Sequence, residues 1–165
     1  MGWQDKIQVK KGNIGESIVR SFLEKKGYCV YMCVTEGAHV FDMLAIKDKK
    51  VFIVAEVKSK ARMNKFEATG INVSHMNEYL HVLQNQGMDV ILFFVDEHPK
   101  SESIYCQALS ELIKPKTVDN VNYPNYDIVK GIVLFSLSDM KHVCSLTKEQ
   151  ISVLKENSSR SYEYK

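Results

Sequence analysis

The chain has 165 residues, 45% of them hydrophobic and 25% charged, and its formal net charge is +2. This length suits one domain with a full core and is too short for two comfortable ones, while the near-neutral charge leaves room only for a local basic patch. The first 20 residues lack an apolar h-region, and no stretch approaches the roughly 18 apolar residues of a membrane span. We therefore expect a single cytoplasmic domain over residues 1–165, with no signal peptide and no membrane contact.

The first part of the chain has the pattern of a helix followed by three strands. Residues 12–27 carry apolar side chains near helical spacing and end in a glycine, which predicts a helix. Residues 28–34 and 40–46 are short and β-prone, and a polar turn separates the second of them from "VFIVAEVKSK" at 51–60. The five apolar residues that open this stretch are typical of a strand buried on both faces, so 40–57 resembles a hairpin.

A second helix and a further strand follow. The segment 59–70, "SKARMNKFEATG", is basic and irregular, and residues 72–86 place their apolar side chains on one helical face. Asn72 is the expected N-cap of this helix and Gly87 its end. The apolar run at 88–96 predicts another buried strand. Because a helix joins it to the preceding strand, we expect these two strands to pair in parallel.

The remaining third of the chain gives weaker signals. Residues 103–114 fit either a strand or a strand leading into a helix, and 115–126, with two prolines and three asparagines, is typical of a loop. Residues 131–140 predict a late strand. Residues 146–157 predict a C-terminal helix with an imperfect capping signal, and 158–165 form a frayed tail.

Two charged side chains stand where the apolar third strand should be ending, and an aspartate lies near the start of the strand before it. Glu56 and Lys58 are two residues apart, so on a strand they face the same side, and in a hairpin the Asp42 carboxylate can sit beside that of Glu56. Two carboxylates this close repel unless a cation is present, and oxygen ligands with open water positions suit Mg²⁺ or Mn²⁺. A lysine beside such a metal can orient or deprotonate water, or stabilise charge on a phosphate. These residues therefore indicate hydrolysis of a phosphodiester.

The first helix offers a further carboxylate. Gly12 and Gly15 leave room for this helix to approach the sheet closely, and Glu16 could then point toward the same metal or its water. A solvated first-turn position, favoured by the helix dipole, is the alternative for this glutamate.

Together these residues resemble the motif of the PD-(D/E)XK nuclease superfamily. The matching positions are Glu16 in the first helix, Asp42 in "VFDMLAI", and Glu56 with Lys58 in "VAEVKSK". The resemblance is to small nucleases of phages and mobile elements and, more distantly, to archaeal-type Holliday junction resolvases. It implies metal binding by Asp42 and Glu56, a catalytic role for Lys58 on the hydrolytic water, and an auxiliary acidic role for Glu16.

The resemblance covers about residues 12–96, and it departs from the named motif at Phe41, where the motif has a proline that is often absent in the family. It implies the α/β restriction-endonuclease-like fold, in which a mixed sheet with an αβββαβ core is flanked by helices. Residues 97–157 would add C-terminal strands and a helix to this core. The implied activity is a Mg²⁺-dependent endonuclease acting on DNA, with Mn²⁺ able to substitute, of phage, mobile-element, repair or restriction type.

Two groups of residues near the motif are candidates for contacts with DNA. Lys60, Arg62 and Lys65 lie in the basic segment after the third strand and would suit phosphates flanking the scissile bond, although a solvated loop is the alternative.

The second helix supplies the other group. In relatives of this fold a polar residue of this helix reaches the active site or the DNA backbone, which points to His75, Asn72 or Tyr79. His75 and Tyr79 are four residues apart and share one helical face. The alternative is a helix whose polar side meets solvent, with Tyr79 half-buried.

Other functions have less support in the sequence. A catalytically silent nuclease-fold module that binds nucleic acid or a protein partner is the main alternative, although the complete set of four residues argues against it. No glycine-rich phosphate loop and no serine nucleophile elbow is present, which disfavours an unrelated metabolic enzyme. Cutting both strands of a duplex calls for two active sites, which favours a homodimer.

The four cysteines show no paired framework. Because they sit in apolar segments, we expect buried thiols in a reducing compartment. A zinc site of Cys29, Cys33 and His39 is the sharper alternative, but no second pair of ligands follows at finger spacing.

Overall fold

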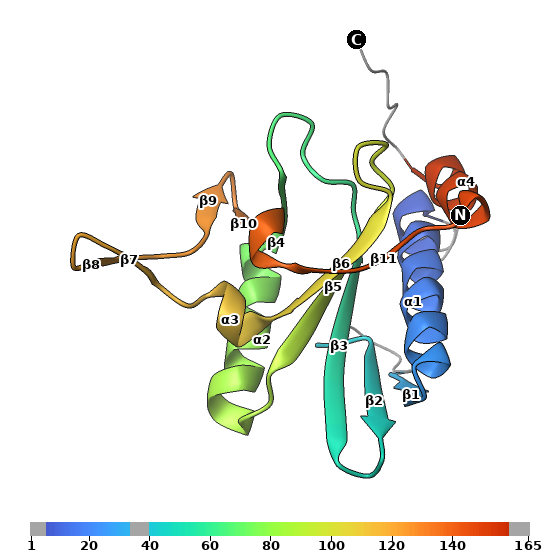
Figure 1. Ribbon diagram of the computed structural model, residues 1–165, viewed down its shortest axis with the longest axis horizontal. Helices are drawn as coiled ribbons and strands as arrows, with labels where there is room; N and C mark the ends of the chain where they lie inside the picture. The colour runs from blue at the N-terminus through green and yellow to red at the C-terminus, as the bar shows by residue number, and fades with distance from the viewer. Residues whose placement is uncertain (1–5, 34–39, 159–165) are drawn as a thin grey trace.

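The structure is a computed structural model that describes residues 6–33 and 40–158. A six-stranded mixed sheet forms its centre, in the order β1-β2-β3-β5-β6-β11, with helices along its faces (Figure 1). The strands of this sheet are β1 (Cys29–Met32), β2 (Met43–Lys47), β3 (Val51–Ser59), β5 (Val90–Asp96), β6 (Ser103–Ala108) and β11 (Lys141–Ser145). Among these described strands, only β3 and β5 pair in parallel. The predicted hairpin and the predicted parallel crossover are therefore confirmed.

Both faces of the sheet are covered, which explains the continuous apolar runs in β3 and β5. The helices are α1 (Ile7–Lys25), α2 (Val73–Gln86), the short α3 (Leu109–Leu112) and α4 (Lys148–Glu156). Alternate residues of β5 point to opposite faces. Leu92 and Phe94 join the core beneath α2, whereas Phe93 and Val95 join the core beneath α1 and α4. None of the helices in the described residues is long and apolar enough to span a membrane.

The helix boundaries differ from the predicted ones at the first helix. α1 begins at Ile7 rather than at residue 12, and Ile7 is exposed, so no apolar stripe marks this first turn in the sequence. Gly27 follows its end with a φ of +85°, the left-handed conformation that favours glycine.

The other two long helices start and end close to the predicted residues. Asn72 occupies the N-cap position of α2, but its side chain makes no capping hydrogen bond. The capping of α4 is better than predicted, because Thr147 and Gln150 form a complete capping box.

Two segments predicted to be irregular contain strands. β4 (Ala68–Asn72) begins in the last three residues of the basic segment and pairs with β10 (Ile132–Ser136), which in turn pairs with β9 (Asp127–Val129) to form a three-stranded sheet. The predicted loop at 115–126 contains a hairpin of β7 (Lys116–Val118) and β8 (Val121–Tyr123). Short strands of this kind depend on partners distant in the chain, which local patterns do not reveal.

The C-terminal third extends the fold in two places. The ambiguous segment at 103–114 is β6 leading into α3, and β6 and the unpredicted β11 complete one edge of the central sheet. The late strand predicted at 131–140 is β10, followed by a short 3₁₀ helix, Leu137–Asp139. The predicted frayed tail lies outside the described residues from 159 onward.

Candidate functional site

The β2–β3 hairpin brings two carboxylates together. Asp42 lies one residue before β2, and its backbone N–H donates to Ala55 O at 3.0 Å. The antiparallel register pairs Met43 with Ala55, so its continuation sets Asp42 opposite Glu56. Asp42 Oδ2 also accepts a 2.6 Å hydrogen bond from Val57 N, which fixes the carboxylate against β3. The side-by-side arrangement expected from the sequence is therefore present, and both carboxylates are buried, at 7% and 5% exposure.

The two oxygens of Glu56 have different surroundings. Oε1 accepts hydrogen bonds from Lys58 Nζ at 2.5 Å and from the Tyr79 hydroxyl at 2.7 Å. Oε2 is buried and has no hydrogen-bond partner among the described residues. An unpaired buried carboxylate oxygen is costly unless something else satisfies it. One end of Glu56 is thus held by the protein, and the other is available to a ligand.

Helix α2 supplies two side chains to this cluster. Tyr79 is almost fully buried, and burial followed by the nearby Glu56 charge raises the pKa of its hydroxyl, so the hydroxyl stays protonated and donates. His75 Nδ1 lies 3.2 Å from Lys58 Nζ. Burial, and then the Lys58 charge, lowers the pKa of His75, which favours a neutral ring that accepts from the lysine. Of the two roles expected for this helix, Tyr79 therefore takes the one at the active site, because its buried hydroxyl contacts Glu56 rather than the surface.

A pocket of about 630 Å³ opens over this cluster, and we call it the hairpin pocket. It is bordered by the N-terminal half of α1, the ends of β2 and β3, the start of α2 and the residues after α4. Its charged or titratable lining residues are Lys11, Glu16, Asp42, Glu56, Lys58, Lys60 and His75. The structure thus brings the four motif residues to one cavity.

Close packing of α1 against β3 carries Glu16 to the pocket. A Cβ on Gly15 would lie 1.7 Å from Ser59 Oγ and 3.1 Å from Ser59 Cβ, so the helix can approach β3 only because residue 15 is glycine. Gly12 was also expected to let the helix approach the sheet closely. This prediction is wrong, because a Cβ on Gly12 would meet no heavy atom within 4 Å.

The basic segment after β3 divides into three different environments. Lys60 lines the hairpin pocket, and its Nζ donates to Gly70 O at 3.2 Å. Lys65 is exposed, and so is Asn72 at the start of α2, but neither lines the pocket. Arg62 is not the exposed phosphate contact that we expected. It is 8% exposed, and its Nη1 forms a 3.0 Å ion pair with Glu67.

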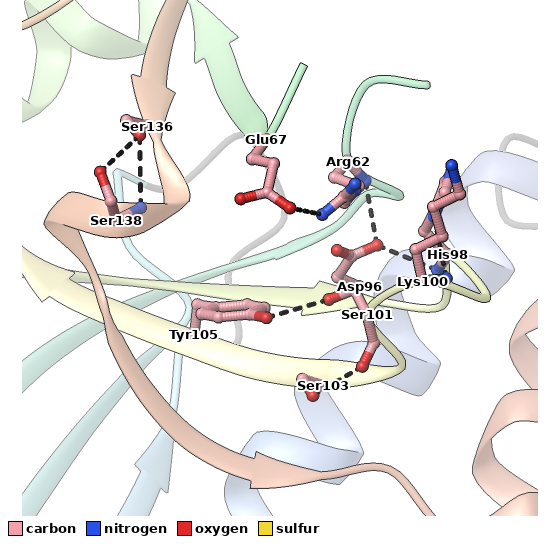
Figure 2. A network of polar contacts seen from close by, with 10 residues as sticks. All are labelled: Arg62, Glu67, Asp96, His98, Lys100, Ser101, Ser103, Tyr105, Ser136 and Ser138. Atoms are coloured by element: carbon pink, nitrogen blue, oxygen red, sulfur yellow. Dashed lines mark hydrogen bonds and ion pairs between the residues drawn. The ribbon is translucent and has the colours of Figure 1, made fainter. Parts of the chain in front are cut away.

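Arg62 belongs to a buried network at the end of β5 that the sequence did not predict (Figure 2). Asp96 Oδ1 accepts hydrogen bonds from Arg62 N at 2.9 Å and from His98 N at 3.0 Å. Next along the chain, the buried Glu97 forms an ion pair with Lys11 of α1. We call these residues the β5-end network. It anchors the loop that follows Lys60 and also ties α1 to the sheet.

The cysteines are less buried than expected. Cys29 is exposed, the other three are partly exposed, and all four are free thiols. Burial, followed by the charges of Asp42 and Glu56, raises the pKa of Cys33, which disfavours the thiolate that zinc needs. His39, the third member of the proposed zinc site, lies outside the described residues.

The donor set of the pocket fits a hard divalent cation with an incomplete protein shell. Within residues 6–33 and 40–158, no group of three or more His, Cys, Asp and Glu side chains could hold a metal ion. Asp42 and Glu56 are two carboxylates, and Mg²⁺ is commonly bound by one or two carboxylates together with waters and substrate phosphates. The unpartnered Glu56 Oε2 is a suitable ligand atom.

Comparison with known proteins identifies the fold. No family model and no curated protein matches the sequence. Among solved structures, the chain is similar to Hjc, a Holliday junction resolvase from the archaeal hyperthermophile Archaeoglobus fulgidus, with a TM-score of 0.52 and 11% identity. The match covers 78% of this chain and 90% of that chain. The chain has a restriction-endonuclease-like fold. At 11% identity, this similarity supports a statement about the fold alone. The predicted mixed sheet flanked by helices is confirmed.

Proposed function

We propose that this chain is a metal-dependent nuclease that hydrolyses DNA phosphodiester bonds in the hairpin pocket. The observation that carries the proposal is the placement of Asp42, Glu56 and Lys58 together at this pocket, with Glu56 Oε2 buried and unpartnered. The fold adds support, because the similar structure is named as a Holliday junction resolvase and so acts on branched DNA.

Asp42 and Glu56 would hold Mg²⁺, or Mn²⁺ in its place. Such an ion lowers the pKa of bound water and stabilises negative charge on a phosphoryl oxygen. Hydrogen bonds already hold both carboxylates in position. Val57 N donates to Asp42, and the side chains of Lys58 and Tyr79 donate to Glu56. Glu16, on the α1 side of the same pocket, is the proposed auxiliary acid.

Lys58 has one remaining donor for the reaction. A protonated lysine has three N–H groups, of which one points to Glu56 Oε1 and one to His75 Nδ1. The third can orient the attacking water or stabilise charge on the phosphate. A neutral His75 can accept a hydrogen bond from the Lys58 ammonium group and does not repel it. We therefore propose that His75 positions the lysine, and that Lys60, at the edge of the pocket, contacts a neighbouring phosphate.

A panel of labelled substrates tests the activity. Duplex, single strand, flap, four-way junction and RNA are incubated with Mg²⁺, with Mn²⁺ and with excess chelator. We expect metal-dependent cleavage of DNA that is abolished in Asp42→Ala and Lys58→Ala and retained in Lys50→Ala, which removes an exposed lysine at the β2–β3 turn. Cleavage that persists in Lys58→Ala or in chelator would show that the activity does not come from this pocket.

Two broader features of the proposal have their own readouts. DNA binding without cleavage under either metal would favour the silent binding module over the nuclease.

We further propose a single domain over the chain that works as a homodimer when both strands are cut, as in phage, mobile-element, repair or restriction nucleases. Light scattering of the protein with and without DNA reports the number of copies in the complex.

A further inference from the structure

A second, smaller pocket adjoins the hairpin pocket. Its volume is about 230 Å³, and Lys60 and Ala61 line both cavities. Lys60 therefore stands at the boundary, where its Nζ donates to Gly70 O at 3.2 Å. The second pocket is smaller than the roughly 300–1,000 Å³ typical of sites for drug-sized ligands, so it suits one flat ring system better than a whole nucleotide.

The outer face of the β4-β10-β9 sheet forms the wall of this second pocket. Residues of β10 alternate: Val133 and Phe135 belong to the core, whereas Ile132 and Leu134 lie on the opposite face and line the pocket. Val129 of β9 is paired with Ile132 and lines the same pocket. The wall is thus an apolar surface that the fold does not use for its own core.

Positive charge borders the apolar wall at two places. Lys60 lies at the junction with the hairpin pocket, and Lys130 lies in the turn between β9 and β10. Lys130 and Gly131 both have positive φ, at 51° and 76°, as expected for a tight hairpin turn that presents its side chains to solvent. An apolar slot with cations at its rim is complementary to a base that is flanked by phosphates.

We propose that this second pocket is a nucleobase subsite, which receives an unpaired base of the strand whose phosphate occupies the hairpin pocket. The inference rests on the proposed nuclease function for the position of that phosphate. Met63, Ile132 and Leu134 provide apolar contacts for the base, as apolar side chains do in other pockets for extruded bases. A paired and stacked base cannot enter. The preferred substrate is therefore DNA with an unpaired nucleotide beside the cleaved bond, such as a flap, a branch or a single strand.

Equilibrium binding in chelator, where cleavage is not expected, tests the subsite. The probes are an intact duplex and the same duplex carrying one unpaired 2-aminopurine, followed by anisotropy for affinity and by base fluorescence. We expect Leu134→Asn to weaken binding of the unpaired probe about tenfold, the effect of losing one base contact, and to leave duplex binding within about twofold. The control is Val118→Asn, an apolar position on the β7–β8 hairpin that lies outside this pocket and is more exposed than the half-buried Leu134.

A second variant keeps the test independent of folding effects. Lys130→Asn suits the left-handed turn and removes the rim charge, and Lys49→Asn is its match because Lys49 has a φ of 56° in the β2–β3 turn. We expect the 2-aminopurine emission change to be reduced by Lys130→Asn and unaffected by Lys49→Asn.

The outcomes separate the two proposals. An equal loss on both probes, or identical behaviour of Leu134→Asn and Val118→Asn, would overturn the nucleobase subsite while leaving hydrolysis intact. A preference for the unpaired probe that disappears in Leu134→Asn, together with no cleavage under any metal, would support the subsite and overturn the nuclease.

Discussion

Two clusters of carboxylates and cations stand at the ends of neighbouring parallel strands, and they differ in what surrounds them. At β3, Asp42, Glu56 and Lys58 face the hairpin pocket. At β5, the carboxylates of the β5-end network are enclosed, with Asp96 at 1% exposure and Glu97 at 0%, although Lys11, the ion-pair partner of Glu97, lines the hairpin pocket. Both clusters follow apolar runs in the sequence, "VFIVAEVK" and "VILFFVDEH". A charged cluster at a strand end is therefore a candidate catalytic site only where it borders a cavity.

The two clusters also use their carboxylates differently. Asp96 Oδ1 accepts two backbone N–H groups, which joins the loop after β3 to the turn after β5. From the described part of the chain, Glu56 accepts only side-chain donors, and only at Oε1. Each carboxylate keeps one buried oxygen without a hydrogen-bond partner, Asp96 Oδ2 and Glu56 Oε2, but of these two residues only Glu56 lines the hairpin pocket. The first arrangement therefore stabilises the backbone, whereas the second presents a carboxylate to a ligand. Substitutions in the two clusters should accordingly separate stability from activity.

The largest expected effect on stability is at Asp96. Asp96→Ala leaves two buried backbone donors without an acceptor, which should lower the free energy of unfolding by roughly 2–4 kcal/mol. Asp96→Asn keeps a side-chain acceptor, and burial already raises the pKa of Asp96, so it should cost much less. Urea unfolding measures both. A stable Asp96→Ala protein that has lost cleavage would instead make the β5-end network part of the active site.

Packing of α1 against β3 gives the next largest effect. Gly15→Ala forces the helix or Ser59 to move, which should destabilise the protein by about 1–3 kcal/mol and reduce cleavage because Glu16 shifts with the helix. Gly12→Ala is the matched control in the same helix. Its Cβ meets nothing, so it should stabilise the protein by about 0.5–1 kcal/mol. Equal destabilisation by both variants would contradict the close approach at Gly15.

A pair of tyrosines compares the clusters directly. Tyr79 donates to Glu56 in the pocket cluster, whereas Tyr105 accepts from Ser101 Oγ at 3.2 Å beside the β5-end network (Figure 2). Tyr105→Phe should cost about 1 kcal/mol or less in unfolding free energy, and Tyr79→Phe roughly 1.5–3 kcal/mol because its partner is a carboxylate. Only Tyr79→Phe should weaken Mn²⁺ binding and slow cleavage, by about tenfold, because Glu56 loses its positioning partner. Equal activity of the two variants would show that Tyr79 is merely structural.

The smallest effect is a pH dependence shared by both clusters. Burial is the largest cause of the lowered pKa of both His75 and His98. Lys58 lowers the pKa of His75 further, and Glu78 and Asp42 oppose this. The unfolded chain then binds more protons than the folded one just below pH 6.5, so stability should fall as the pH drops through this range. His75→Gln should remove part of this slope and leave the share of His98. An unchanged slope would mean that His75 titrates normally.

The sequence predicted the pocket cluster because its signals are local. The two-residue spacing of Glu56 and Lys58, and the length of the hairpin to Asp42, determine a shared face without knowledge of the rest of the fold. Gly15 was predicted for the same reason, as a small residue one position before Glu16.

Other features depend on contacts that no local pattern records. Strand β4 exists because it pairs with β10, about sixty residues later, and Arg62 is buried because Asp96 and Glu67 lie beside it. Before the fold is known, the basic segment looks uniformly exposed. The inward direction of Tyr79 was likewise left open, since a tyrosine on a helix can face either the core or the solvent.

The central claim is that a divalent metal binds at Asp42 and Glu56 and not at the β5-end network. Binding of Mn²⁺ tests this claim most directly, because it compares the two clusters without depending on the choice of substrate. Titration calorimetry or electron paramagnetic resonance is applied to the wild type, Glu56→Gln, Asp42→Asn and Asp96→Asn. We predict that the wild type and Asp96→Asn bind the ion, and that Glu56→Gln and Asp42→Asn, while still folded, lose binding at least tenfold. Unchanged binding in Glu56→Gln, or loss confined to Asp96→Asn, would contradict the assignment of the metal to the hairpin pocket.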